Sequence, residues 1–204
     1  MALIENVDYL SIPAKANEMR EKGRELNLEI TNAYKSVTEM HEFWYGTRYN
    51  ELVKTFNKMI PGLNDLLRLV VTDIPVTLET IANNYSQVDR GTVATAVNNE
   101  LPKNIVEIPV IQDVGMRFLT ASVTEEKAKV QANFEKAKEL MNEIEAKYNL
   151  IAWKSESADA FKKRFTELKN QIVVSLDETN VQFAKLMEQT QQDIQKAENA
   201  NTVN

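Results

Sequence analysis

The chain has 204 residues, of which 43% are hydrophobic and 26% are charged, and its formal net charge is −6. Five glycines and five prolines are too few for a fold with many turns, so a compact all-β protein is disfavoured. The acidic balance argues against a general nucleic-acid binder, and the absence of cysteine excludes disulfides and cysteine metal sites.

The first segment has apolar residues at alternating steps of three and four, which is typical of an amphipathic helix with one buried face. Ser11 and Pro13 suit the N-cap and first turn of this helix. Gly23 falls on the apolar stripe, where it would let a neighbouring helix approach closely. The stripe consists of Ile12, Ala16, Met19, Gly23, Leu26, Ile30, Ala33 and Val37.

A second helical segment is predicted after Gly46. Pro61 and Pro75 interrupt it, and each removes a hydrogen bond within the helix and crowds the preceding turn. We therefore expect a kink or a break near each proline, with the apolar stripe continuing across it. That stripe consists of Leu52, Phe56, Met59, Leu63, Leu66, Val70, Ile74, Leu78, Ile81, Tyr85 and Val88.

The region from Arg90 to Ser122 differs in composition from the segments on either side. It contains two glycines, two prolines and a β-branched run around Ile105 to Ile111. A structureless loop of about 30 residues is improbable in a compact domain. We expect residues 105–111 to be extended and to pack along the helices.

Two further amphipathic segments follow this connection, the second of them beginning near Glu156. The third stripe is the most regular and keeps steps of four and three throughout. It consists of Val130, Phe134, Ala137, Met141, Ile144, Tyr148 and Ile151. The fourth consists of Phe161, Phe165, Leu168, Ile172, Leu176, Thr179, Phe183 and Leu186.

Four stripes in two pairs predict an all-α protein with two antiparallel helical hairpins that form an elongated four-helix bundle, with a partly extended connection between them. The expected organisation is a first hairpin at residues 1–91, a connecting segment at residues 92–122 and a second hairpin at residues 123–204. The only two tryptophans, Trp44 and Trp153, lie 109 positions apart, one near each hairpin turn, which indicates a weak internal duplication.

Each turn carries a tripeptide headed by its tryptophan. In the first, Gly46 can leave helical dihedral angles without steric cost. Trp44-Tyr45-Gly46 matches the W-x-G tripeptide of the WXG100 (ESAT-6-like) family of helical hairpins, which the chain resembles as two fused units. Trp153-Lys154-Ser155 is a degenerate second copy, in which Ser155 replaces the glycine. The resemblance implies a pseudo-dimer of two hairpins within one chain, or a homodimer.

A second motif carries the resemblance further. Tyr85 and Asp89 fit Y-x-x-x-[DE], the C-terminal export signal of that family for type VII secretion. The resemblance implies that the export ATPase reads these two residues and that the Trp44–Gly46 turn completes the recognition surface. The partner would be this ATPase or another WXG100-like protein. The chain would then be secreted or reach the cell surface without a cleaved signal peptide.

No catalytic, metal or cofactor motif stands out. His41 is the only histidine, so a zinc site would need His41 and carboxylates alone. The sequence has no E-x-x-H motif, no glycine-rich phosphate loop and no G-x-S-x-G motif. We therefore predict a protein that is not an enzyme and needs no cofactor.

Other interpretations remain open from the sequence. Trp44 and Trp153 can be packing residues, lining residues of a recognition groove, or both. Tyr85 can be a stripe residue with Asp89 beside it by coincidence. Instead of an export substrate, the chain could be a cytoplasmic scaffold whose stripes bind partner helices. It could also be a toxin-like bundle with residues 105–111 as the membrane element, although we expect no stable membrane insertion.

Overall fold

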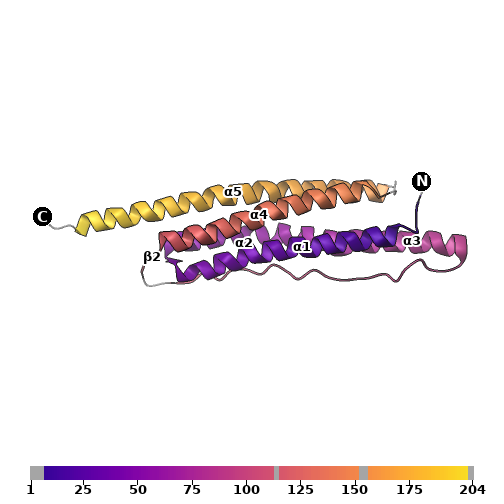
Figure 1. The fold of residues 1–204 in the computed structure, drawn as a ribbon, viewed down its shortest axis with the longest axis horizontal. Coiled ribbons are helices and arrows are strands. Elements are labelled where there is room, and N and C mark those ends of the chain that lie inside the picture. The colour runs from indigo at the N-terminus through magenta and orange to yellow at the C-terminus, as the bar shows by residue number, and fades with distance from the viewer. Residues whose placement is uncertain (1–6, 113–114, 152–155, 202–204) are drawn as a thin grey trace.

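In a computed structural model, which describes residues 7–112, 115–151 and 156–201, the chain forms an elongated all-α bundle (Figure 1). This confirms the predicted fold class of two helical hairpins in a four-helix bundle. The elements are α1 (Ile12–Glu39), the 3₁₀ turn η1 (Met40–Glu42), β1 (Trp44–Tyr45), α2 (Thr47–Arg68), the π-helical turn η2 (Leu69–Asp73), α3 (Ile74–Arg90), β2 (Arg117–Phe118), α4 (Thr120–Asn149) and α5 (Glu156–Asn201).

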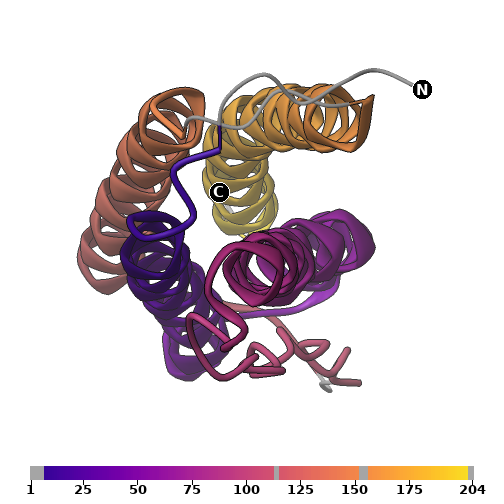
Figure 2. The same cartoon turned by 90° about the vertical axis from the view of Figure 1, so that its right-hand side faces the viewer.

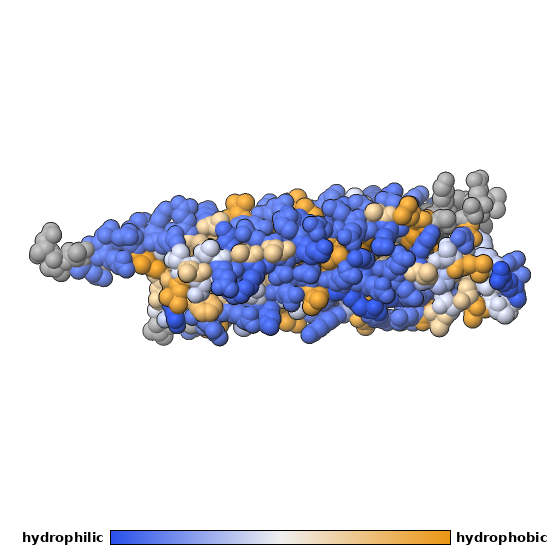
Figure 3. Space-filling model, in the orientation of Figure 1, coloured by the Kyte–Doolittle hydropathy of each residue, from blue (hydrophilic) through white to orange (hydrophobic). Residues whose placement is uncertain are grey.

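The two halves pack on each other along their length. α1 lies along α4 and α2 lies along α5, while α2, η2 and α3 follow one another as a single rod. An end-on view shows the helical columns arranged around a common centre (Figure 2). The surface in Figure 3 is mostly hydrophilic on the face shown, because the apolar stripes face inward.

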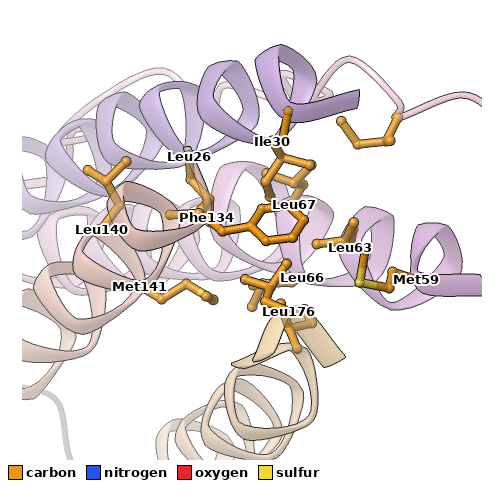
Figure 4. Close-up of a cluster of buried hydrophobic side chains, with 14 of the residues drawn as sticks. Leu26, Ile30, Met59, Leu63, Leu66, Leu67, Phe134, Leu140, Met141 and Leu176 are labelled. Atoms are coloured by element: carbon orange, nitrogen blue, oxygen red, sulfur yellow. The ribbon is translucent and has the colours of Figure 1, made fainter. Parts of the chain in front are cut away.

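The core contains residues of every long helix. Phe56 of α2 stacks on Phe134 of α4, with 5.7 Å between the ring centroids, so the two hairpins are joined through aromatic packing. Every residue of the first and third predicted stripes is buried. Figure 4 shows side chains from four helices meeting in this core, among them Leu26, Ile30, Leu63, Leu66, Phe134, Met141 and Leu176.

The second stripe was predicted correctly only as far as Leu78. Tyr85 is 36% exposed and Val88 is 90% exposed, so their predicted burial was wrong. The π-helical turn η2, in which the Ile74 N–H bonds the Leu69 carbonyl five residues back, precedes Ile74 and Leu78, which are buried as predicted. Beyond Leu78 the buried residues of α3 are Glu79, Ala82 and Ser86, so Ser86 and not Tyr85 faces the core.

The two prolines of this rod behave differently. The α-helix α2 continues through Pro61, which is exposed, so the alternative of a break there was wrong. Near Pro75 the α-helix is interrupted, as predicted, by the π-helical turn that ends just before it. A proline lacks the N–H that an α-helix needs, and the irregular turn accommodates that loss.

Gly23 allows α1 to pack closely against η2. A Cβ atom added to Gly23 would lie 2.6 Å from Cγ2 of Val71 and 3.0 Å from Cγ1 of Val70. Both valines are fully buried, so neither can move into solvent. The close helix approach that the sequence predicted at this glycine is therefore confirmed.

We expect Gly23→Ala to lower the free energy of unfolding by about 1–3 kcal/mol, because the added methyl group overpacks this contact. Gly62→Ala is the matched control. A Cβ atom there meets nothing within 4 Å, and alanine should raise stability by about 0.5–1 kcal/mol through its helix propensity. Urea denaturation followed by circular dichroism measures both. Equal effects from the two substitutions would contradict the close-packing argument.

The connection runs back along the bundle as an extended segment. We call residues 92–112 the strap. It passes along α3, η2 and α2 from the end of α3 toward β2 (Figure 1). Ile105 and Ile108 are buried on the bundle, at 5% and 4% exposure, as predicted for this β-branched run. They are thus covered in the folded chain and would have to be released before touching a membrane.

Candidate functional site

The first candidate site is the elbow between α1 and α2, residues 40–47. Gly46 has φ +116° and ψ −171° and directly precedes the first residue of α2. This positive φ is strained for any residue with a side chain. A Cβ atom at Gly46 would also lie 3.4 Å from the carbonyl oxygen of Gly115. The predicted role of Gly46 as the turn residue is therefore confirmed.

The indole of Trp44 closes this end of the bundle. Trp44 is fully buried, and its ring lies against Phe118, Tyr49 and Phe183, with centroid distances of 5.4, 6.1 and 6.1 Å. Phe183 belongs to α5, so the tryptophan joins the elbow of one hairpin to a helix of the other. The packing role of Trp44 is confirmed, whereas a recognition role for the elbow stays a prediction.

A short strand pair fixes the elbow to the start of the second half. Trp44 pairs with Phe118 and Tyr45 pairs with Arg117 in an antiparallel ladder, and the Leu119 N–H donates to the Phe43 carbonyl at 2.9 Å. This contact was not predicted from the sequence. Strands of two residues carry no alternation pattern, and their partners lie more than 70 positions apart, so no sequence signal marks them.

A pocket of about 340 Å³ lies beside the elbow. Its wall includes Gly46, Met116, Arg48 and Asp193. Arg48 Nη2 lies 3.5 Å from Asp193 Oδ2, so a cation of α2 and a carboxylate of α5 pair there while both stay partly exposed. The pocket offers charged groups of both signs beside an apolar floor, but no catalytic arrangement.

The second candidate site is the end of α3, where Tyr85 and Asp89 lie. The helix ends at Gly91, which has the left-handed φ of +70°. Tyr85 and the carboxylate of Asp89 are one turn apart, and both are exposed, as is Val88 between them. The two residues of the predicted export signal therefore share an accessible face.

The segment before α1 contacts this site. The Tyr9 hydroxyl donates a hydrogen bond to Asp89 Oδ2, and the Arg90 guanidinium lies 5.8 Å from the centroid of the Tyr9 ring. The hydrogen bond raises the pKa of the Tyr9 phenol, because losing its proton would place a negative charge beside the carboxylate. Arg90 Nε also lies 3.6 Å from Asp89 Oδ2, which gives the carboxylate a cationic neighbour.

The two candidate sites lie at opposite ends of the molecule (Figure 1). The rod of α2, η2 and α3 separates Gly46 from Tyr85 by on the order of 60 Å, at about 1.5 Å per helical residue. Within a single copy the Trp44–Gly46 turn therefore lies far from Tyr85 and Asp89, and a recognition surface that uses both stays a prediction. A helical rod has no bend that could fold its two ends together.

The second turn carries the other predicted recognition residues, Trp153 and Ser155, which lie outside the described residues. The described residues before this turn end at Ile151, and α5 begins at Glu156 after it. The Lys15 ammonium donates to the Leu150 carbonyl at 3.3 Å, so this turn begins beside the first turns of α1. The end of the molecule that carries Tyr85 and Asp89 is thus also the end where the second turn begins.

A series of asparagines on α2 binds the strap through hydrogen bonds. This interaction was not predicted from the sequence. Asn50, Asn57 and Asn64 each bind both main-chain groups of one strap residue. The side-chain amide donates to the carbonyl and the side-chain oxygen accepts from the N–H of the same residue. The pairs are Asn64 with Ile105 (3.1 and 2.8 Å), Asn57 with Ile108 (2.8 and 3.0 Å) and Asn50 with Ile111 (2.7 and 3.2 Å).

We call these three residues the asparagine ladder. A signal for it exists in the sequence, because asparagines at a spacing of seven occupy one face of a helix and the paired isoleucines recur at every third position. Neither pattern by itself predicts a contact. The two are identified as partners only because the distances between their members match and the two segments run in opposite directions.

A buried ion pair holds the other half of the strap. Arg20 of α1 is 1% exposed and Glu79 of α3 is 2% exposed, and their side chains bond to each other at two positions. Arg20 also donates to the Asn98 carbonyl at 2.7 Å, while Glu79 accepts from the Asn98 N–H at 2.9 Å. The ion pair therefore hydrogen-bonds both main-chain groups of Asn98, just as each asparagine hydrogen-bonds both main-chain groups of an isoleucine.

Among the described residues, no helix has a segment both long and apolar enough for a bilayer crossing. Nor do His41 and the described carboxylates gather in a group of three that could hold a metal ion. His41 lies 5.4 Å from Tyr49 and 6.0 Å from Tyr45 between ring centroids, so it belongs to the aromatic packing of the elbow.

The comparisons with known proteins leave the site to be interpreted from its own geometry. No family model, no curated protein and no solved structure matches this chain.

Proposed function

We propose that the chain is a non-enzymatic export substrate or escort of a type VII secretion system, built as a tandem of two WXG100-like hairpins. The proposal rests on the W-x-G tripeptide at a hairpin elbow and on Tyr85 and Asp89 at the end of the same hairpin. It places the protein outside the cell or at its surface, with the export ATPase or another WXG100-like protein as partner.

The observation that carries the proposal is the exposure of Tyr85 and Asp89. If Tyr85 were an ordinary stripe residue, it would lie in the core with Leu78. Instead it is 36% exposed, one turn before Asp89 and near the end of α3. Val88 is also exposed beside them.

The partner half of such a signal would come from the second hairpin. The contact from Lys15 to Leu150, together with an ion pair of 2.8 Å between Lys147 and Glu18, holds the end of α4 against α1. In this arrangement a single chain would present Tyr85 and Asp89 at the end of the molecule where α4 ends, as a monomeric pseudo-dimer.

The test is export of variants from cells that carry the secretion system. Tyr85→Ala and Asp89→Ala should each lower the amount of protein in the culture medium at least about tenfold, while the protein inside the cells stays folded. Gln87→Ala is the matched control, since Gln87 is exposed in the same turn at a position that the motif leaves unspecified. Unchanged export of both variants at normal expression would exclude the proposed signal.

Cell fractionation distinguishes this proposal from a cytoplasmic scaffold. The scaffold interpretation needs apolar stripes that are open to partner helices. The stripe residues of α1 and α4 are instead buried against each other and against the other helices of the same chain. We therefore expect the wild-type protein in the medium or at the cell surface, and retention of all of it in the cytosol would favour the scaffold.

A further inference from the structure

The asparagine ladder binds an extended segment through hydrogen bonds to the main chain of that segment. Each of its side-chain amides donates to a carbonyl and accepts from an N–H of one residue, as a neighbouring β-strand does. The spacing fits such a ligand. Seven helical residues rise about 10.5 Å, and three residues of an extended chain cover about 9–10 Å. A regular match over the three ladder positions requires a ligand that repeats every third residue.

The side chains of the strap follow the same repeat. Ile105 and Ile108 are buried at the ladder, whereas Val106 between them is 74% exposed. Three residues per turn is the period of the polyproline II conformation, in which one side chain in three faces the same way. The bundle therefore buries an apolar residue at the ladder positions of Ile105 and Ile108 and leaves the residues between them exposed to solvent.

The prolines of the strap set its register. Pro102 and Pro109 both lie outside the ladder positions, where no N–H is required. A slip of three residues that brought Pro102 opposite Asn64 would leave the asparagine oxygen without a donor, because proline has no N–H. The site thus disfavours a slip in that direction through the main chain.

We infer that the asparagine ladder, with the surface under Ile105 and Ile108, is a peptide-binding site, and that its ligand class is an extended chain with an apolar residue at every third position. The strap occupies it within the folded chain. The ligand from outside the chain is the strap of a second copy, since that segment carries the same isoleucine spacing and the same prolines. This inference does not depend on the proposed export function.

The experiment opens the site and supplies the ligand separately. In the full chain, residues 101–112 are replaced by a flexible Gly/Ser linker of about 24 residues, long enough to span the bundle without occupying the site. A labelled synthetic peptide of residues 99–112 then represents the strap of a second copy, and fluorescence anisotropy measures its binding. We expect saturable binding, and Asn57→Leu in the opened chain should weaken it at least about tenfold.

Two matched controls test main-chain reading. A peptide N-methylated at Ile108, which lacks the N–H that Asn57 accepts, should bind at least about tenfold more weakly. N-methylation at Val106, outside the ladder, should change binding less than about threefold. Asn170→Leu, at an exposed position of α5, should leave it unchanged. Absence of peptide binding, or equal binding of the two methylated peptides, would overturn the inference.

The unopened chain provides a second measurement if the opened one loses its helices. Amide hydrogen exchange at Ile108 should accelerate at least about tenfold in Asn57→Leu and stay unchanged in Asn170→Leu. Unchanged protection of Ile108 in Asn57→Leu would overturn the inference in that case.

Discussion

Glu79→Ala should lower the free energy of unfolding by about 3–5 kcal/mol, because it leaves the buried Arg20 cation without its partner. The loss reaches the strap as well, since Glu79 also accepts the N–H of Asn98. Urea denaturation of the purified chain, followed by circular dichroism, measures the change. A loss below about 1 kcal/mol would show that water replaces the carboxylate.

Two controls separate pairing from burial. Arg24 pairs with Glu100 of the strap, but its side chain is 53% exposed, so Arg24→Ala should cost no more than about 1 kcal/mol. The double variant Arg20→Met with Glu79→Leu removes both charges and should recover part of the loss. Recovery stays incomplete, because Asn98 then lacks partners for its N–H and its carbonyl.

Trp44→Ala should lower the free energy of unfolding by a similar amount, about 3–5 kcal/mol, because it empties a fully buried indole site. The cavity would lie between the elbow and Phe183 of α5, so the variant weakens the contact between the two halves. The measurement is again urea denaturation. A loss of less than about 1 kcal/mol would contradict the packing role assigned to this residue.

Trp44→Phe distinguishes packing from recognition. Phenylalanine keeps an aromatic ring against Phe118 and Phe183, so most of the stability should remain. If the variant is stable and exported normally, the indole serves packing only. If it is stable but export falls at least about tenfold, the export machinery reads the elbow separately from Tyr85 and Asp89.

The helices could be predicted from the sequence because helix periodicity is local. The stripe of α1 and the stripe of α4 each follow from residues three or four positions apart, and every member of both is buried. Gly46 as the turn and Gly23 as a close contact followed from the same reasoning, since glycine permits a backbone or an approach that other residues do not.

The errors in the candidate site arose from interactions that no local pattern contains. The predicted stripe allowed for a kink or break near Pro75 and continued through Tyr85, whereas the residues buried beyond Leu78 are Glu79, Ala82 and Ser86. The separation of Trp44 from Asp89 within one copy follows from the length of the helical rod between them. The spacing of apolar residues along a helix predicts the buried face only as far as that spacing continues.

The sequence alone determined that this protein is all-α, which faces of its helices are apolar, and where its first hairpin turns. Only the tertiary structure decided that Arg20 and Glu79 pair in the core, that the asparagine ladder holds the strap, and that Tyr85 is exposed. The physical reason is the separation along the sequence between the residues that interact. Helix faces are set by neighbours within about one turn, whereas these three features depend on how residues distant in the sequence pack together.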